Sequence, residues 1–345
     1  IIVDLYSWDN LDNDTKIYYT IDGSNPLTNG ILYSNSINIT STTCLKFYAE
    51  DFTGLRSDVI CCNYIFDNVA NINSGKGFNT IQSAIDDADT HDGDTIKVKE
   101  GLYQEHITLN KHLNLIGYNT TLKGSSSVNP VIGVTNAGSN SIVYGFNIVN
   151  STFGVVILNA CNVSIMGNTF LNLHSSIETN GDVNSLIAYN TIDCDHYIGG
   201  MSGFTIRKSD NLTIFNNTIS LNSNDDSVGI IITDGTSDNI SITNNKILSK
   251  NSLKGIGLYV TCSNISIEHN TISNFTAALV ISSSNSLIDN NCLNDNGYGI
   301  LLLRSINNTY KSNNIFNNLY GVFLHQALES HDDSFYLNRL CDNYY

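Results

Sequence analysis

The sequence predicts an all-β protein: a right-handed parallel β-helix of about ten or eleven coils behind a small N-terminal β-sandwich. Three observations predict it. One short phrase recurs with a period in the twenties, apolar residues alternate within that phrase, and the first 66 residues lack the period. We expect a fibronectin- or immunoglobulin-like sandwich over 1–66, a linker and capping helix over 67–93, and the β-helix over 94–345.

The first 66 residues are expected to form antiparallel strands joined by tight turns. The candidate strands are KIYYTIDG (16–23), SINIT (36–40), CLKFYAED (44–51) and VICCNYIF (59–66). The phrase YYTIDGSNP (18–26) resembles the Y-Y-T-x-D-G-S-x-P phrase of a sandwich module found at the C-terminus of chitobiase and hexosaminidase enzymes. The resemblance implies an accessory module and says almost nothing about activity.

A short amphipathic helix is expected between the sandwich and the coils. In FNTIQSAIDDAD (78–89), apolar side chains recur at helical spacing, at Phe78, Ile81, Ala84, Ile85 and Ala88. Such a helix can lie across the first coil and cover an exposed strand edge. The chain stops at CDNYY without a comparable cap, so we expect the gene product to continue beyond Tyr345.

The coils follow from a phrase that occurs eight times: apolar, any, apolar, any two, Asn, any, apolar. Its copies are VSIMGNTF (163–170), SLIAYNTI (185–192), LTIFNNTI (212–219), ISITNNKI (240–247), ISIEHNTI (265–272), SLIDNNCL (286–293), NTYKSNNI (308–315) and DSFYLNRL (333–340). Apolar positions alternate with period two, so these are strands, and a second apolar strand such as GVVIL (154–158) precedes each copy. Leucine-rich repeats need a helical return path, which is missing, so a parallel β-helix is favoured.

The recurring Asn is predicted to be structural. In stacked coils about 4.8 Å apart, an Asn amide can donate to and accept from the Asn of the next coil. We also expect it to adopt the left-handed backbone conformation at a corner. The predicted ladder is Asn168, Asn190, Asn217, Asn245, Asn270, Asn291, Asn313 and Asn338, and Phe146 takes the Asn position in an earlier coil.

A wider resemblance covers the whole chain. Residues 75–124 look like the opening of pectin-lyase-like and nitrous-oxide-accessory (NosD-type) β-helices. Together with the sandwich module and the Asn- and Ile-rich coils, the chain resembles the adhesin-like surface proteins of methanogenic archaea. The resemblance implies a cell-envelope protein that contacts other cells or glycans.

Composition excludes several classes of partner. The net charge is −16 with only 16 Lys and Arg and no basic cluster, so nucleic acid is not an expected partner. No run of 18 apolar residues is present, so no membrane span is expected. Cys44 with Cys61 or Cys62 is the candidate disulfide, with Cys44–Cys62 as our choice, because these residues sit on two strands joined by the turn DFTGLRS. The remaining thiols are expected to be buried small hydrophobes.

Sequons support a secreted product. The N-x-S/T motif marks candidate glycosylation sites, several of them just before the strand phrase. They are Asn13, Asn38, Asn119, Asn150, Asn162, Asn211, Asn239, Asn264, Asn274 and Asn307, and Asn216 also satisfies the motif.

A candidate binding region lies where the period stretches to 27 and 28 residues. Extra residues after the phrase in three consecutive coils, at 193–202, 220–228 and 248–254, stack into one loop wall. The ligand-binding candidates there are Asp193, Asp195, His196, Tyr197, Asn224, Asp225 and Asp226. Clustered oxygen ligands make calcium conceivable, although solvated acidic loops are the simpler interpretation, and no cofactor and no metal site are predicted.

The same residues can be compared with the catalytic motifs of β-helical enzymes. SNDDSVGI resembles the Asp-Asp pair of polygalacturonase-like glycosidases, but the matching Asn-Thr-Asp, His-Gly and Arg-x-Lys motifs are missing. A lyase or epimerase needs an Arg or Lys base, for which Arg207 is the nearest candidate, although its strand need not face the loop wall. We therefore expect no catalytic residues.

The expected function is a non-enzymatic, extracellular or cell-envelope adhesin-like protein. Its expected partners are cell-surface glycans or proteins of other cells, or copies of itself. Two alternatives stay open: a structural subunit of a surface layer or sheath, and a polysaccharide lyase or glycoside hydrolase with a groove at 193–254.

Overall fold

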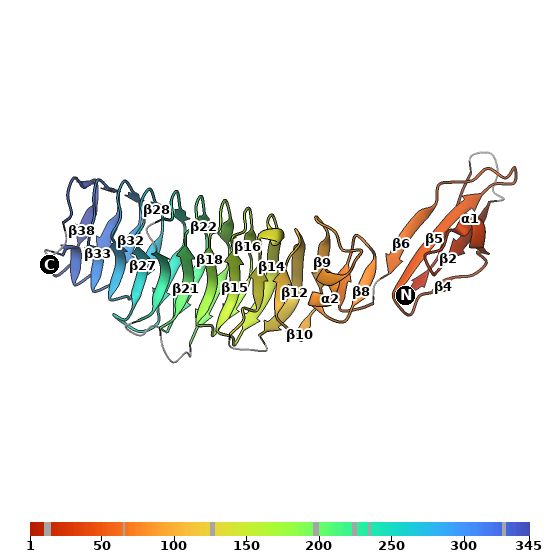
Figure 1. Ribbon diagram of the computed structural model, residues 1–345, viewed down its shortest axis with the longest axis horizontal. Coiled ribbons are helices and arrows are strands. Elements are labelled where there is room, and N and C mark those ends of the chain that lie inside the picture. The colour runs from red at the N-terminus through yellow and green to blue at the C-terminus, as the bar shows by residue number, and fades with distance from the viewer. Residues whose placement is uncertain are drawn as a thin grey trace. The chain divides into compact units, whose positions relative to one another are not determined.

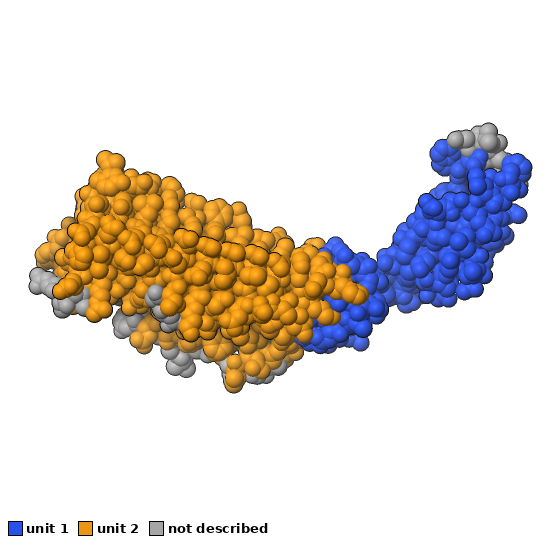
Figure 2. Space-filling model, turned by 45° about the horizontal axis from the view of Figure 1, so that its top comes forward, with its two compact units in different colours: residues 1–90, 95–97 blue, residues 91–94, 98–345 orange. Residues whose placement is uncertain are grey.

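The computed structural model describes residues 1–9, 15–64, 66–124, 128–195, 200–222, 226–233, 236–325 and 329–345. It divides the chain into two compact units, residues 1–90 with 95–97 and residues 91–94 with 98–345 (Figure 2). Strands dominate both units, and among the described residues the helical elements are α1, α2 and a short 3-10 turn, η1 (Asn136–Gly138).

The first unit contains a small antiparallel sheet with strand order β3-β2-β5-β6, next to the short antiparallel pair β1–β4. Its elements are β1 (Ile2–Val3), β2 (Lys16–Thr20), α1 (Pro26–Asn29), β3 (Ile31–Leu32), β4 (Ile37–Asn38), β5 (Thr43–Glu50), β6 (Ile60–Tyr64), β7 (Val69–Asn71), β8 (Lys76–Phe78), α2 (Ile81–Asp86) and β9 (Thr95–Val98), of which Val98 belongs to the second unit.

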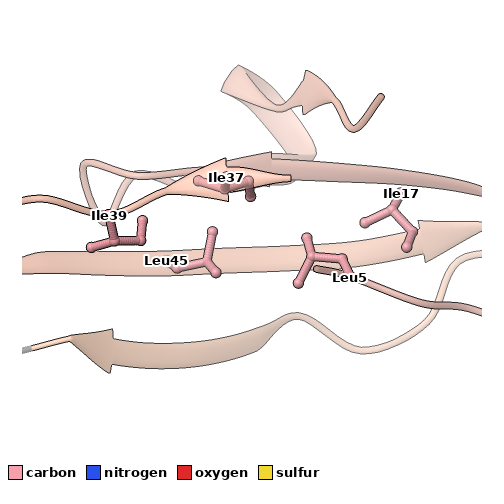
Figure 3. Packing of buried hydrophobic residues seen from close by; sticks show 5 residues of the cluster. All are labelled: Leu5, Ile17, Ile37, Ile39 and Leu45. Carbon is pink, nitrogen blue, oxygen red and sulfur yellow. The ribbon is translucent and has the colours of Figure 1, made fainter. Parts of the chain in front are cut away.

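Alternation along β2 and β5 puts one face of this sheet in a small core. Leu5, Ile17, Ile37, Ile39 and Leu45 gather there, from β2, β5 and the segments around β1 and β4 (Figure 3). The buried core thus joins residues between Leu5 and Leu45 of the predicted sandwich, and Tyr64 of β6 packs against it.

The predicted Cys44–Cys62 disulfide is wrong, because Cys61 and not Cys62 lies beside Cys44. In the β5–β6 pairing Leu45 lies opposite Cys62, whereas Cys44 lies opposite Asn63 and Lys46 opposite Cys61. Side chains alternate between the two faces of a strand, so Cys62 points to the same face as Leu45, away from Cys44. Cys61 shares the face of Cys44, and their Sγ atoms are 3.3 Å apart as free thiols.

The predicted amphipathic helix is present as α2, shorter than its sequence pattern. Thr80 caps it by accepting a hydrogen bond from the Ser83 amide, and Ile81, Ala84 and Ile85 are its buried side chains. The helix ends at Asp86 because Asp87 returns to an extended conformation.

The second unit is a right-handed parallel β-solenoid of about ten coils, as predicted, with successive coils stacked rung on rung (Figure 1). Each coil contributes one strand to a 10-stranded sheet and, from β16 on, two short strands to a larger sheet. The 10-stranded sheet consists of β11 (Ile107–Leu109), β13 (Ile132–Val134), β15 (Phe153–Leu158), β18 (Ser175–Asn180), β21 (Ser202–Arg207), β24 (Val228–Thr233), β27 (Ile256–Val260), β30 (Ala277–Ile281), β33 (Tyr298–Leu302) and β36 (Tyr320–Leu324).

The larger sheet has two parallel rows of short strands. The first row is β16 (Ser164–Met166), β19 (Leu186–Ala188), β22 (Thr213–Phe215), β25 (Ser241–Thr243), β28 (Ser266–Glu268), β31 (Leu287–Asp289), β34 (Thr309–Lys311) and β37 (Ser334–Tyr336). The second row is β10 (Gly101–Gln104), β17 (Thr169–Leu171), β20 (Thr191–Cys194), β23 (Thr218–Leu221), β26 (Lys246–Ser249), β29 (Thr271–Ser273), β32 (Cys292–Asn294), β35 (Asn314–Phe316) and β38 (Arg339–Cys341). The longer strands β12 (Asn114–Lys123) and β14 (Ile142–Val149) span both rows.

Identical register from coil to coil builds the core of the solenoid. Ile192, Ile219 and Ile247 pair in sequence across β20, β23 and β26, and all three are fully buried. At about 25 cal/mol per Å² of buried apolar surface, such columns supply the main stabilisation of the coils. The outward side chains of each strand do not form this core, and neither do the corners between strands, so both are available for other roles.

Candidate functional site

The recurrent Asn residues occupy the bend between the two short strands of each coil. Asn217 shows the pattern: its Oδ1 accepts hydrogen bonds from both N and Nδ2 of Asn190, at 2.9 and 3.0 Å. Its Nδ2 donates to Asn245 Oδ1 at 3.0 Å and to the Ile187 carbonyl at 2.9 Å. The chain of bonds runs from Asn168 to Asn338, so the predicted ladder residues are saturated by each other.

The ladder Asn is not the left-handed residue of the corner, contrary to our expectation. Positive φ occurs one position earlier, for example at Gly167 (62°), Tyr189 (58°), Asn216 (53°) and His269 (58°). The ladder position therefore selects Asn for its amide and its burial, and the preceding position turns the chain.

A second Asn ladder went unpredicted. Asn296 Nδ2 donates to Asn318 Oδ1 at 3.0 Å, and Asn318 Nδ2 donates to Asn343 Oδ1 at 3.1 Å. The backbone amide of Phe275 donates to Asn296 Oδ1 at 3.0 Å, as that of Phe146 does to Asn168 in the first ladder. The signal in the sequence is an Asn five residues after the first-ladder Asn in the last three coils.

Within the loop wall, Asp193 and Asp195 are engaged by a cation. The Lys250 ammonium, from two coils further along, forms ion pairs with both carboxylates. Partial burial works to lower the pKa of Lys250, but the two carboxylates outweigh it and the pKa is raised. One ammonium thus offsets one of the two negative charges and occupies an oxygen of each carboxylate, which leaves the pair poorly suited to hold calcium.

Of the other predicted wall residues, Asp226 lines a shallow pocket, and His196, Tyr197, Asn224 and Asp225 lie outside the described residues. The pocket has a volume of about 240 Å³. That is below the roughly 300–1,000 Å³ of pockets for drug-sized ligands, so it suits one small unit such as a single sugar.

The pocket lies on outward-facing positions of β18, β21 and β24. Its walls combine charged, hydroxyl and apolar side chains: His174, Glu178, Gly200, Met201, Ser202, Thr205, Arg207, Asp226, Val228 and Ile231. Cross-strand pairing puts Glu178 beside Thr205, and Thr205 beside Ile231. The period-two rule explains why these side chains face outward while Ile177, Phe204 and Ile206 fill the core.

Arg207 is the principal cation of this pocket. Its guanidinium lies 3.7 Å from the Glu178 carboxylate, and its side chain is 43% exposed. Beside it, Thr205 Oγ1 donates to Ser202 Oγ at 2.9 Å, and Ser202 Oγ donates to Ser175 Oγ at 3.1 Å. A planar cation, carboxylates and a row of hydroxyls are the groups that hydrogen-bond sugar hydroxyls and carboxylates. The sequence left the orientation of Arg207 open, and in the structure Arg207 lines the same pocket as Asp226.

The sequons fall into one main row. Asn162, Asn211, Asn239, Asn264 and Asn307 are exposed and have positive φ at the same corner of five coils, and Asn184 and Asn285 take that corner in two coils between them. In four of these sequons, the Asn Nδ2 donates a hydrogen bond to a residue one coil earlier that is not itself a sequon Asn. The pairs are Asn162 to Asn140, Asn211 to Asn184, Asn264 to Asp238 and Asn307 to Asn285.

The other sequons lie apart from this row. Asn38, Asn119, Asn150 and Asn216 are exposed, Asn274 is half-buried, and Asn13 lies outside the described residues.

With the geometry in place, comparison with known proteins identifies the family. The family described as "Periplasmic copper-binding protein (NosD)" matches residues 87–261, which is 175 of the 345 residues. The chain belongs to this family. Its NosD segment is flanked by a chitobiase/β-hexosaminidase C-terminal domain match at 7–61 and is overlapped by a right-handed β-helix region match at 236–340.

A curated relative of this NosD-family chain is the "Cell surface glycoprotein" of Methanothermus fervidus. The two are 36% identical over 108 residues, which cover 30% of this chain and 17% of the relative. The predicted resemblance to surface proteins of methanogenic archaea agrees with this match.

Solved structures similar to the chain share its fold at low identity. The periplasmic alginate epimerase AlgG has a TM-score of 0.51 and 11% identity, over 77% of this chain and 84% of that chain. A polygalacturonase from Erwinia carotovora has a TM-score of 0.49 and 13% identity, over 74% and 90%. The likeness to AlgG shows the β-helix fold alone.

The family description names copper, but the residues present do not fit a copper site. Copper in proteins is held by clustered His, Cys or Met ligands. Across the ranges that the structure describes, no group of three or more His, Cys, Asp or Glu side chains is arranged to hold a metal ion. No copper chemistry is therefore derived for this chain.

Proposed function

We propose that this chain is a non-enzymatic component of a cell envelope whose β-helix binds glycans of other cells through the pocket around Arg207. The observation that carries the proposal is the pocket itself, where a half-exposed guanidinium, the Glu178 carboxylate and the half-buried Ser202 hydroxyl meet, with the buried Thr205 hydroxyl bonded to Ser202 behind them. The repeated Asn residues cannot serve this role because they are bonded to each other and, apart from the half-buried Asn338, are buried.

An extracellular location is supported by two matches. The family description is that of a periplasmic protein, and the relative is named a cell surface glycoprotein. Among the described residues, no helix has the length and apolar character needed to cross a membrane. The row of sequons at one corner fits a surface exposed to glycosylation.

A glycan array with the full chain tests binding. We expect retention of a defined set of glycans, and we expect Arg207→Ala to weaken it at least tenfold, because Arg207 supplies the fork of donors in the pocket. Lys208→Ala, one position along and outside the pocket, is the matched control and should leave binding unchanged. No binding to any glycan, or equal binding by Arg207→Ala, contradicts the proposal.

A polysaccharide-active enzyme is the second candidate. It is favoured by the same pocket, because Arg207 pairs with Glu178 there, and Asp226 and His174 line the pocket as well. Such an enzyme would release unsaturated products or new reducing ends from uronic-acid polymers in the presence of calcium.

A further inference from the structure

Two thiols on the N-terminal sheet are brought together although they are 17 positions apart. Cys44 lies in β5 and Cys61 in β6, diagonally across the antiparallel pair, and their Sγ atoms are 3.3 Å apart. The two sulfur atoms are thus already in contact, although diagonal neighbours are farther apart than directly opposed residues. Reaching the bonding distance of about 2.05 Å requires rotation about both Cα–Cβ bonds and a local shift of edge strand β6.

The surroundings favour reaction at this pair. Cys61 is exposed, and β6 is the edge strand of the sheet, so a small reagent can reach its sulfur. Burial raises the pKa of the Cys44 thiol, with the hydrogen bond to Cys61 as the next cause, so Cys44 is the slower nucleophile of the two. By contrast, Cys194 and Cys262 are buried in the coils.

We propose that Cys44 and Cys61 form a disulfide by exchange with a small-molecule disulfide, and that it fastens edge strand β6 to β5. The Cys61 thiolate attacks one sulfur of the small disulfide and releases one thiolate, leaving a mixed disulfide on Cys61. The Cys44 thiolate then attacks Cys61 Sγ and releases the second thiolate. Two protein thiols are oxidised, losing two protons and two electrons, and one small disulfide is reduced to two thiols.

The cross-link has a structural consequence at the edge of the sheet. It closes a loop through the turn at residues 51–58, whose Phe52 and Leu55 side chains are exposed. Closing a loop of this size removes conformational freedom from the unfolded chain, and a fixed edge strand frays less. The inference stands on the sheet geometry and does not depend on glycan binding.

Cysteine mapping by mass spectrometry tests the proposal. The full chain is reduced, incubated with oxidised glutathione, unfolded and alkylated before digestion. We expect one linked peptide joining Cys44 to Cys61, with the other six cysteines alkylated, and no link in Cys61→Ser. The matched control Cys62→Ala, whose side chain points to the opposite face, should still form the link, as should Cys292→Ala in the coils.

Thermal unfolding supplies a second readout. In the wild-type chain the oxidised form should unfold several degrees above the reduced form, and this difference should vanish in Cys61→Ser. Complete alkylation of Cys44 and Cys61 after oxidation, a Cys44–Cys62 link, or a glutathione adduct that never resolves would each overturn the proposal.

Discussion

At the scale of single residues, the structure separates residues that hold the coils together from residues that are available to partners. A ladder Asn satisfies the amide of its neighbour in the preceding coil and donates to its neighbour in the next, all within a buried bend. Arg207, Thr205 and Ser202 instead project from a strand face into a pocket. The commonest motif of the sequence is thus the least accessible one.

Replacing a ladder Asn should destabilise the coils strongly. Asn217→Ala removes the acceptor of two buried donors on Asn190, and each unsatisfied buried group costs about 1–3 kcal/mol. We expect a loss of about 2–4 kcal/mol in the free energy of unfolding, measured by urea denaturation.

The adjacent residue provides the control for that experiment. Asn216 is exposed with φ +53°, a conformation that Gly adopts freely, so Asn216→Gly should change stability little. If the Asn216 variant were as destabilised as the Asn217 variant, the ladder would not be the source of the effect.

Asp182 should make stability depend on pH. The residue is buried, its Oδ1 accepts from Ser185 at 2.6 Å, and burial raises its pKa to about 6. The folded state thus binds the proton more tightly than the unfolded state, in which the pKa is about 3.9. The contribution of Asp182 to stability is therefore greatest below about pH 4, falls as pH rises toward 6 and levels off above it.

The variant Asp182→Asn should lack this pH dependence. It keeps an oxygen to accept from Ser185 but carries no charge to bury, so at pH 7.5 we expect it to be more stable than wild type by on the order of 1–3 kcal/mol. Urea midpoints at pH 4.5 and pH 7.5 measure this. A wild-type chain that gains stability between those pH values, relative to the variant, would contradict the assignment.

At the scale of elements, each corner of the coil has its own chemistry. The bend between the short strands carries the Asn ladder, and the corner that precedes each copy of the phrase carries the sequon row. The larger loops carry Lys250 and the acidic pair. The proposed binding pocket therefore lies on one outward strand face and the sequons lie at a corner, while the inward positions repeat from coil to coil.

We expect an Asn at this corner of the coil to be glycosylated whenever it lies in a sequon. Thr213→Ala removes the sequon of Asn211, and Leu186→Thr creates one at Asn184, its partner one coil earlier. In a secretory host that performs N-glycosylation, we expect the first variant to lose one glycan and the second to gain one, read from glycopeptide masses. Glycans confined to Asn119 and Asn274, with this corner empty, would contradict the expectation.

At the scale of the whole molecule, the repeat made the fold predictable, whereas the features that depart from the repeat could not be predicted from it. Because the same phrase recurs, it determines the strands, the bend and the inward face of each coil, so the ladder positions could be predicted from the spacing of the recurring Asn. Loops of unequal length give no such rule, which is why the reach of Lys250 across two coils to Asp193 and Asp195 was missed.

The pocket, and the choice of Cys61 over Cys62 as the neighbour of Cys44, could not be predicted for related reasons. The orientation of Arg207 depends on where its strand begins, which the preceding loop decides. In the N-terminal sheet, the register of β6 depends on the turn closed by the Glu50–Arg56 bridge. A shift of one residue there exchanges Cys61 for Cys62, because alternate side chains face opposite sides.

The most direct test of a non-enzymatic, glycan-binding β-helix measures binding and turnover in one sample. Proton NMR would follow the full chain with a glycan that it retains, and separately with uronic-acid polymers and calcium, with Arg207→Ala in parallel. We predict ligand broadening that Arg207→Ala abolishes and a glycan that stays intact. Unsaturated products, epimerised sugars or new reducing ends that appear with wild type and not with Arg207→Ala would contradict the account.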